Sequence, residues 1–506
     1  MSQQKEYIIT VNNPAVWEEV WDLFTVDGLG DNYIPSRHID VINERPFNDY
    51  VAHFSLTDAE AAELKQDSRF VSVELQADQQ PGVDKGFVGI RPGLYDKSGT
   101  TSSNMKNWGL LRCTNNTNPF TPSLSINGNY TYNLDGTGVD IVVIDSGVEA
   151  GHPEFAVNAD GTGGSRVVDF NWASLGVPGV PSSTSIGGYL GDSDGHGNHC
   201  AGIAAGNTHG WAPGAAIYSI RIFSGTNPRT GQYLGAINSD ICFDLVRAFH
   251  LKKIAEGNTR PTICTNSWGY RSSGYSSMTY TVYRGVQYNI TSRNTAYGQV
   301  NFFHPYVINY LDASANNASA AGVIMVGAAG NYYHKIDVPG GLDYDNYYRY
   351  ADFEDVYYHR GMSPTRASSM INVGAIDNTS TEQRADYSET GPGVHVYAPG
   401  SSVMSALSSY YGSVTDPRNS SYRIGKISGT SMACPQVTGM LACVLQARPG
   451  MTTAEAKAFI SENSVNNALQ VSGTENYSNQ RSLQDGNNRI LKTPFTNPVR
   501  GGINSA

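Results

Sequence analysis

Four polar residues, far apart in the sequence, have the types needed to hydrolyse an acyl bond. Asp145 ends the apolar run VDIVVID, and His196 lies in a Gly-His-Gly turn. Asn331 follows GVIMVGAAG, and Ser431 stands between a Gly-Thr turn and an expected helix. A serine hydroxyl attacks a carbonyl when an imidazole removes its proton and a carboxylate orients the imidazole. An amide NH₂ group can stabilise the oxyanion that forms.

Each of these residues also has an ordinary structural interpretation. Asp145 could form an Asp-Ser-Gly turn, and Asn331 could occupy a left-handed turn. Ser431 could be a helix N-cap. His196 and His199 could be hydrogen-bonded turn residues or a zinc pair, although no third zinc ligand has a recognisable spacing. A buried carboxylate at a strand end needs a partner, which favours an interacting set of residues.

The elements that must position these residues lie between residues 107 and 465. Helical stretches such as 239–255 separate short apolar runs at 139–145, 216–223, 262–268, 322–329 and 370–376. Continuous apolar strands are typical of a parallel sheet that is buried on both faces. We therefore predict an α/β domain with an open, mostly parallel sheet flanked by helices. Sites in such sheets lie beyond the carboxyl ends of the strands.

The first 76 residues form a separate pattern. Strands are expected at 6–11, 37–42, 49–56 and 69–76, with a helix after Asn13 and a second helix opened by a Thr57/Glu60 capping box. This βαββαβ order predicts a small, ferredoxin-like α+β domain over 1–76. Residues 77–106 are rich in Gly, Pro and Ser and predict a linker that is open to proteolysis. Residues 466–506 are interpreted as a polar C-terminal extension.

Composition narrows the classes of function. The 506 residues carry a net charge of −11, which argues against a nucleic-acid partner. We find no apolar run long enough to span a membrane and no secretory signal pattern. The six cysteines are too sparse for a disulfide framework and are expected to be buried thiols. Two Tyr- and Asn-rich segments, 270–307 and 332–361, are expected to be long functional or decorative loops.

Four sequence blocks resemble those of subtilisin-like serine proteases, the subtilases. They are DSG at 145–147, HGNH at 196–199, AAGN at 328–331 and GTSMACP at 429–435. The order Asp, His, Ser is that of subtilisin and differs from that of α/β-hydrolases. The resemblance covers about residues 107–465. Residues 6–76 more weakly resemble the inhibitory propeptide of the family. The chain departs from the family pattern at Asn198, Cys200 and Gln436.

The resemblance implies a serine endopeptidase that acts on polypeptides. Ser431 would be the nucleophile, His196 the general base and Asp145 the residue that orients His196, with Asn331 as oxyanion donor. The substrate would lie against Ser267, Trp268 and Gly269 on one side and Ala328, Ala329 and Gly330 on the other. No cofactor is required. Calcium is a common stabiliser in this family, and the candidate ligands are Asp343, Asp345 and Asp352, whose spacing fits no EF-hand loop, so that an exposed loop is the better interpretation.

The resemblance also implies a self-processing zymogen, with residues 1–76 as an intramolecular inhibitor and a cut within 77–106. The alternative is a catalytically silent, subtilase-like structural subunit, for instance of a viral particle. All four catalytic positions are intact, which favours the enzyme. For localisation, a virion-associated or released protein is expected, with the cytoplasm as the alternative.

Overall fold

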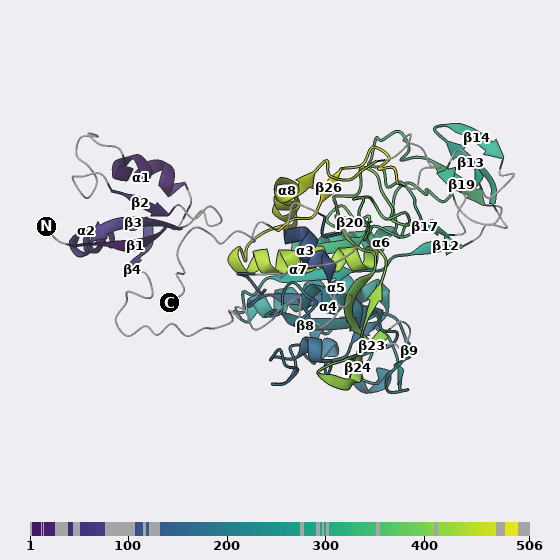
Figure 1. The fold of residues 1–506 in the computed structure, drawn as a ribbon, viewed down its shortest axis with the longest axis horizontal. Helices are drawn as coiled ribbons and strands as arrows, with labels where there is room; N and C mark the ends of the chain where they lie inside the picture. Colours follow the sequence, from purple (N-terminus) through teal and green to yellow (C-terminus); the bar gives the residue numbers. More distant parts are fainter. Residues whose placement is uncertain are drawn as a thin grey trace. The chain divides into compact units, whose positions relative to one another are not determined.

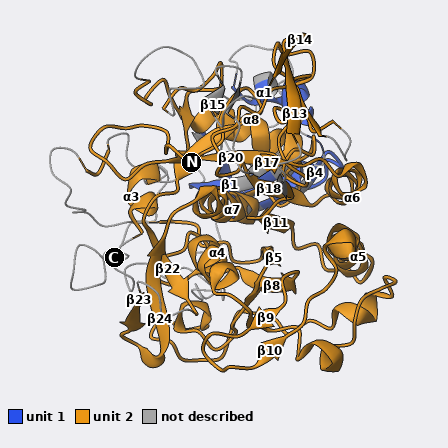
Figure 2. Ribbon diagram, turned by 90° about the vertical axis from the view of Figure 1, so that its right-hand side faces the viewer, with its two compact units in different colours: residues 1–88, 498–506 blue, residues 89–497 orange. Residues whose placement is uncertain are grey.

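The chain forms two compact units (Figures 1 and 2). Residues 1–88 with 498–506 make up one unit, and residues 89–497 make up the other. The computed structural model describes residues 3–11, 13, 15–25, 39–43, 51–75, 107–114, 118–120, 132–273, 278–289, 294–295, 298–299, 303–350, 355–408, 413–471 and 481–493. Each unit has its own hydrophobic core.

The N-terminal unit has the predicted βαββαβ order. Its elements are β1 (Gln4–Val11), α1 (Val16–Thr25), β2 (Val41–Asn43), β3 (Val51–Thr57), α2 (Asp58–Leu64) and β4 (Phe70–Leu75). The strands pair antiparallel in the order β2-β3-β1-β4. Thr57 Oγ1 accepts a hydrogen bond from Glu60 N, and the Glu60 carboxylate accepts one from Thr57 N, which is the predicted capping box. Val20, Phe24 and Leu64 from the helices are buried with Phe54 of the sheet.

The larger unit is built on an eight-stranded sheet in the order β25-β26-β21-β20-β18-β11-β5-β8. All neighbours pair parallel except β25 and β26. The strands are β5 (Asp140–Asp145), β8 (Ala216–Arg221), β11 (Thr262–Asn266), β18 (Ile324–Ala328), β20 (Ile371–Ile376), β21 (Val396–Pro399), β25 (Val465–Asn466) and β26 (Arg489–Ile490). The five predicted apolar runs are all strands of this sheet, so the predicted α/β architecture is confirmed.

Helices cover both faces of the sheet because its strands are apolar on both faces. Ile141 and Val143 of β5 pack in one core with α4 (His196–Ala205) and α7 (Thr430–Ala447). Val142 and Ile144 pack in a second core with α5 (Cys242–Ala255) and α6 (Asn309–Ala320). The remaining helices are α3 (Trp108–Thr114) and α8 (Thr453–Asn463), and short 3₁₀ turns occur at Pro153–Phe155, Trp172–Leu175, Ser183–Ile186 and Ser239–Ile241.

Helices α4 and α7 approach each other closely because small residues line their contact. A Cβ atom on Gly439 of α7 would lie only 2.4 Å from the Ala204 carbonyl oxygen of α4. Such a contact would displace one helix from the other, since protein interiors have little free volume. The contact fixes the relative positions of His196, at the start of α4, and Ser431, in the first turn of α7.

The two Tyr-rich segments are more ordered than the predicted long loops. Strands β13 (Met278–Tyr283) and β14 (Val286–Asn289) from the first segment join β19 (Tyr347–Tyr350) from the second in one antiparallel sheet. This sheet extends at the upper right of Figure 1. Tyr348 of β19 stacks on Tyr358, with ring centroids 4.0 Å apart. Tyrosine and threonine favour strands when such packing is available, and the sequence alone did not reveal the packing.

The remaining strands form small antiparallel pairs and one further three-stranded sheet. The sheet has the order β22-β24-β23, with β22 (Val403–Leu407), β23 (Ser413–Asp416) and β24 (Asn419–Ile427). The pairs are β6 (Gly147–Val148) with β7 (Gly191–Asp192), β9 (Gly225–Thr226) with β10 (Tyr233–Leu234), β12 (Arg271–Ser273) with β17 (Phe303–Pro305), and β15 (Asn294–Thr295) with β16 (Gly298–Gln299).

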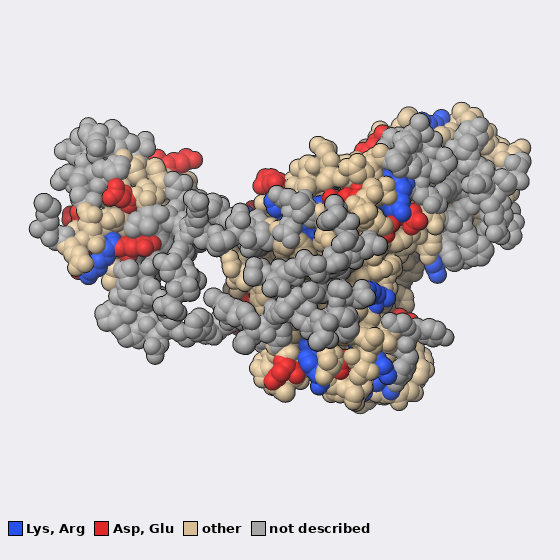
Figure 3. All heavy atoms as spheres, viewed as in Figure 1, with Lys and Arg blue, Asp and Glu red and all other residues tan. Residues whose placement is uncertain are grey.

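The distribution of charged side chains and the state of the cysteines match what the composition predicts. Figure 3 shows acidic and basic side chains interspersed over the face that it displays. All six cysteines are buried and free. Among the helices of the described residues, none has the length and apolarity of a membrane span. The segment predicted as a C-terminal extension contributes β26 to the central sheet.

Candidate active site

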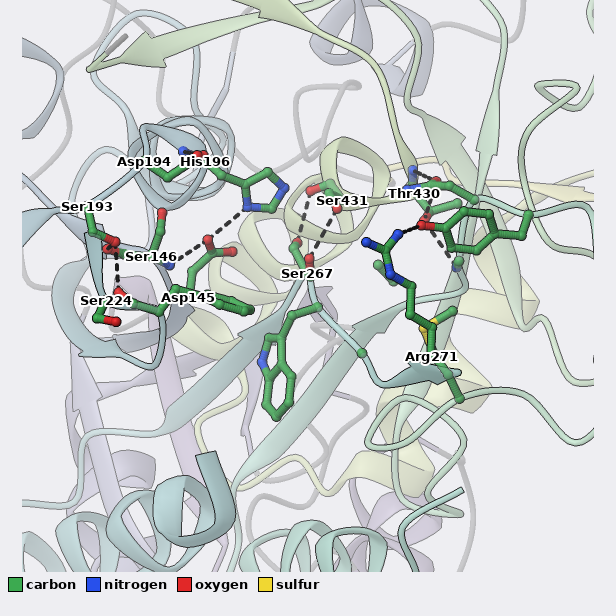
Figure 4. A pocket seen from close by; sticks show the side chains of 18 residues that line it. Asp145, Ser146, Ser193, Asp194, His196, Ser224, Ser267, Arg271, Thr430 and Ser431 are labelled. Atoms are coloured by element: carbon green, nitrogen blue, oxygen red, sulfur yellow. Dashed lines mark hydrogen bonds and ion pairs between the residues drawn. The ribbon is translucent and has the colours of Figure 1, made fainter. Parts of the chain in front are cut away.

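Asp145 is the last residue of β5, and its buried carboxylate faces His196. Asp145 Oδ1 accepts a 2.7 Å hydrogen bond from Ser146 N and lies 2.8 Å from His196 Nδ1. A carboxylate only accepts hydrogen bonds, so the proton of the neutral imidazole lies on Nδ1. His196 Nε2 is therefore left as an acceptor, and Figure 4 shows the imidazole lying between Asp145 and Ser431.

A second carboxylate, which the sequence analysis did not identify, organises the start of α4. Asp192 Oδ1 accepts hydrogen bonds from Ser146 Oγ at 2.7 Å and Gly195 N at 2.8 Å, and Oδ2 accepts one from Asn198 N at 2.8 Å. These N–H groups belong to the helix start, where the helix itself supplies no acceptor. Burial raises the pKa of Asp192 to about 6, although these hydrogen bonds oppose the shift. The acidic sequence GDSDGHG, which contains Asp192 and leads into α4, could have indicated this role.

Ser431 lies in the first turn of α7 and is only 8% exposed. Its hydroxyl donates a 3.1 Å hydrogen bond to the Ser267 carbonyl, and Ser267 Oγ donates a 2.9 Å bond to the Ser431 carbonyl (Figure 4). Cys200 Sγ also lies 3.4 Å from the Ser431 carbonyl oxygen. Residues of α4, α7 and the end of β11 are thus held together at one place. The hydroxyl in this conformation is bonded to Ser267 and not to His196.

Asn331 follows β18 and is fixed by its amide oxygen. Its Oδ1 accepts hydrogen bonds from Thr430 N and Thr430 Oγ1, each 2.9 Å long. Because both donors face Oδ1, the NH₂ group is the part of the amide left to donate toward the cavity that Asn331 lines. The structure thereby presents an N–H donor beside the first turn of α7.

One cavity of about 490 Å³ brings nearly all of the predicted residues together. Its walls include Asp145, His196, Ser431, Asn331, Ser267, Trp268, Gly269, Ala328 and Gly330. Among the predicted catalytic and substrate-binding residues Ala329 is the exception, because it is fully buried in the neighbouring core. The volume falls within the usual range of ligand sites. The cavity lies at the carboxyl ends of β5, β11 and β18, as expected for an open α/β sheet.

Electrostatics favour a charged imidazolium at His196. Burial lowers the pKa of His196, but the interactions with Asp145 and Cys200 together outweigh burial, so the pKa lies well above its ordinary value. His199 behaves differently: burial lowers its pKa to about 3, and its Nε2 is 3.0 Å from the Gly425 carbonyl oxygen. His199 is therefore a neutral residue held by the β24 backbone, which favours the structural interpretation over the zinc pair.

The two calcium candidates among the described residues, Asp343 and Asp345, are each paired with basic side chains. Asp343 is buried and its carboxylate is paired with Lys335 at 2.9 Å and Arg284 at 2.7 Å. Asp345 is paired with Arg360 at 2.6 Å. Asp352 lies outside the described residues. Two cations already neutralise Asp343 and a third is paired with Asp345, so these two residues do not fit a calcium ion.

Among the cavity residues that the sequence analysis did not identify, three lie in the Tyr-rich segments or directly after them. Arg271 donates a hydrogen bond to the Tyr332 hydroxyl, with its guanidinium 5.6 Å from the centre of the Tyr332 ring. Met362 lines the same cavity. None of the three belongs to a motif with a fixed spacing, and no sequence signal distinguished them.

Comparison with known proteins identifies the family. The subtilase family model matches residues 136–488, so the chain belongs to the subtilase family. The matched region includes all four sequence blocks and most of the larger unit.

Individual relatives are distant. The chain is 27% identical over 440 residues to an extracellular serine proteinase of Thermus sp. (strain Rt41A), covering 87% of this chain and 74% of that protein. It is 28% identical over 409 residues to a cuticle-degrading protease of Metarhizium anisopliae, covering 79% and 75%. A solved cold-adapted subtilisin-like serine proteinase aligns with a TM-score of 0.47 at 23% identity, over 76% of this chain and 97% of that one.

Proposed function

We propose that the protein is a serine endopeptidase that hydrolyses peptide bonds through Asp145, His196 and Ser431. The observation that carries the proposal is the 2.8 Å hydrogen bond between Asp145 and His196 at a cavity that Ser431 and Asn331 also line. An aspartate, an imidazole, a serine hydroxyl and an amide donor together are the apparatus of acyl transfer.

In the proposed reaction, Ser431 Oγ turns from the Ser267 carbonyl to His196 Nε2 and attacks the peptide carbonyl. This movement is a rotation about one side-chain bond, and such rotamers are separated by small energies. His196 takes the serine proton and then gives it to the leaving amine, while Asp145 stabilises the imidazolium. The Asn331 NH₂ group donates to the oxyanion, and the positive end of the α7 dipole favours the same charge.

A substrate can add to the cavity as an extended strand. Ser267 and Gly269 on one side and Ala328 and Gly330 on the other offer small side chains, so peptide backbone can approach protein backbone. Strand addition of this kind takes its affinity from main-chain hydrogen bonds. We therefore propose a polypeptide substrate.

Labelling by a fluorophosphonate probe tests the function. The wild-type chain is expected to be labelled at Ser431, and Ser431→Ala and His196→Ala are expected to lose the label. Ser421→Ala, which removes an exposed hydroxyl, is the matched control and should label normally. A folded wild-type protein that takes no label and cleaves no peptide would instead be the silent structural subunit.

We further propose that the chain is a self-processing zymogen whose N-terminal unit inhibits the catalytic unit. The support is the βαββαβ order of a unit with its own core, resembling the family's propeptide. We expect wild-type protein to be cut within 77–106 and Ser431→Ala to stay full length when purified alone. Mass spectrometry of the new termini locates the cut. If Ser431→Ala is trimmed as readily as wild type, self-processing is wrong while the peptidase assignment is unaffected.

A further inference from the structure

Glu389 is a buried carboxyl group that has no partner. Its side chain is 0% exposed, and neither Oε1 nor Oε2 accepts a hydrogen bond in the structure. Its backbone N donates a 2.9 Å hydrogen bond to the Gly330 carbonyl, which places it directly behind a wall of the cavity. Buried polar groups normally have partners, because removal from water is costly. The unpaired carboxyl therefore indicates that a ligand could supply the missing hydrogen-bond donors.

Only a thin layer separates this carboxyl from the cavity. A Cβ atom on Gly330 would lie 2.4 Å from Glu389 Oε1 and 2.5 Å from the Met362 methyl group. A Cβ atom on Gly269, on the opposite wall, would lie 2.3 Å from Met362 Sδ. The Met362 side chain therefore crosses from one glycine to the other, in front of Glu389. Methionine is unbranched and flexible, so this layer can rearrange.

We propose that Glu389 determines specificity by pairing with a cationic side chain, lysine or arginine, of the residue that precedes the cleaved bond. This inference rests on the proposed function. The substrate side chain enters between Gly269 and Gly330, displaces the Met362 thioether and donates hydrogen bonds to the Glu389 carboxylate. A carboxylate at the bottom of the corresponding pocket gives trypsin its basic preference.

Selectivity follows from the cost of an unpaired group. An apolar substrate side chain leaves both Glu389 oxygens without a donor, whereas an ammonium or guanidinium group satisfies them. An acidic side chain would gain no ion pair with Glu389. Burial holds the pKa of Glu389 well above its ordinary value, so the carboxyl is neutral while unpaired and releases its proton when the cation binds.

Other charges at the cavity do not offset this attraction. Arg271 is exposed, and its guanidinium is engaged with Tyr332. Water screens an exposed charge, whereas Glu389 acts through a low-dielectric interior. Asp194 also lines the cavity, and its negative charge acts in the same sense as that of Glu389.

Peptidyl-coumarin substrates that differ only in the residue before the coumarin test the inference. We expect kcat/KM for lysine and arginine to exceed that for leucine at least about tenfold. Glu389→Gln keeps the size but removes the charge, and should lower kcat/KM for lysine about 10²-fold while leaving leucine within about threefold. Glu462→Gln removes an exposed carboxylate from α8 and should leave every substrate unchanged.

Two results would overturn the inference. One is a wild-type enzyme that cleaves leucine as well as lysine or arginine, a measurement that needs no variant to fold. The other is Glu389→Gln lowering all substrates equally, which would indicate a structural role. In both cases fluorophosphonate labelling of Ser431 would persist, and the proposed function would stand. Loss of labelling and of all peptide cleavage would instead overturn the proposed function itself.

Discussion

Asp145 uses a single carboxylate oxygen, Oδ1, to hold His196 Nδ1 at 2.8 Å, while its second oxygen, Oδ2, is buried and has no partner. Asp145 therefore orients the imidazole through one short hydrogen bond, and the other contact to Nδ1 is the longer one from Cys200 Sγ, at 3.8 Å. Ser146 N shares the same oxygen and fixes the carboxylate in turn. This relationship sets the pH dependence of the proposed reaction.

The reaction needs a neutral imidazole, so kcat/KM should rise with pH as His196 loses its proton. Burial lowers the pKa of His196, but Asp145 and Cys200 together raise it by more, and the midpoint should lie above the ordinary value of 6.5. Asp145→Asn removes the attracting charge and should shift the midpoint to lower pH, with kcat reduced about 10⁴-fold. Asp244→Asn, at an exposed site on α5, is the control. A pH–rate profile that is unchanged in Asp145→Asn would contradict the assignment.

Removal of the Asn331 donor should affect the transition state more than substrate binding. Asn331→Ala is expected to lower kcat about 10²–10³-fold with little change in KM, a magnitude taken from the corresponding asparagine of subtilisin. Steady-state kinetics on one peptide substrate measure both constants. Thr430→Val, which removes one of the two donors that hold the Asn331 oxygen, should give a smaller loss in kcat. A rise in KM alone would place Asn331 in binding instead.

Cys200 offers a route for inhibition by thiophilic metals. Its Sγ lies 3.8 Å from His196 Nδ1, and the possible ligand atoms of Asp145, His196 and Cys200 all lie within 4.8 Å of one another. We expect Hg²⁺ to abolish fluorophosphonate labelling and Cys200→Val to restore it in the presence of Hg²⁺, because soft metals prefer thiolates. Cys443→Val, at a buried thiol on α7 away from the cavity, should remain sensitive. Equal inhibition of both variants would exclude Cys200 as the target.

A buried ion pair should dominate acid sensitivity. Arg418 binds Glu154 at 2.5 Å and Asp416 at 2.6 Å. Burial would raise the pKa of Glu154, but Arg418 and His209 pull it well below its ordinary value. The group therefore stabilises the fold above its unfolded pKa, and this stability is lost as the pH falls below about 4.5.

Arg418→Met should reduce the free energy of unfolding by about 3–5 kcal/mol at neutral pH, because it leaves Glu154 uncompensated. The measurement is chemical denaturation in a Ser431→Ala background, which prevents self-digestion. Lys252→Met breaks the exposed pair with Glu256 and should cost less than about 1 kcal/mol. Similar losses of unfolding free energy in the two variants would show that the buried Arg418 pair stabilises the fold no more than an exposed pair does.

Sequence reasoning was most reliable where a pattern is local. The five apolar runs and the capping box at Thr57 formed as expected because their signals lie within a few residues. The sheet that joins β13 with β19 was missed, since its partners come from separate segments. Asp192 and Glu389 were also missed, because their importance depends on neighbours distant in sequence, such as Asn198 and Gly330. Family motifs identified Asp145 and Ser431, whose roles remain predictions until the kinetics are measured.

Strand β26 has a consequence for biosynthesis. Ile490 pairs with Tyr397 of β21 and so covers what would otherwise be an open edge of the sheet. A ribosome must therefore add Ile490 before the catalytic unit can close that edge. The N-terminal unit, whose strands are complete by Leu75, can fold long before this point. Translation order alone thus makes the four-stranded sheet of the small unit available before the larger unit has finished its sheet.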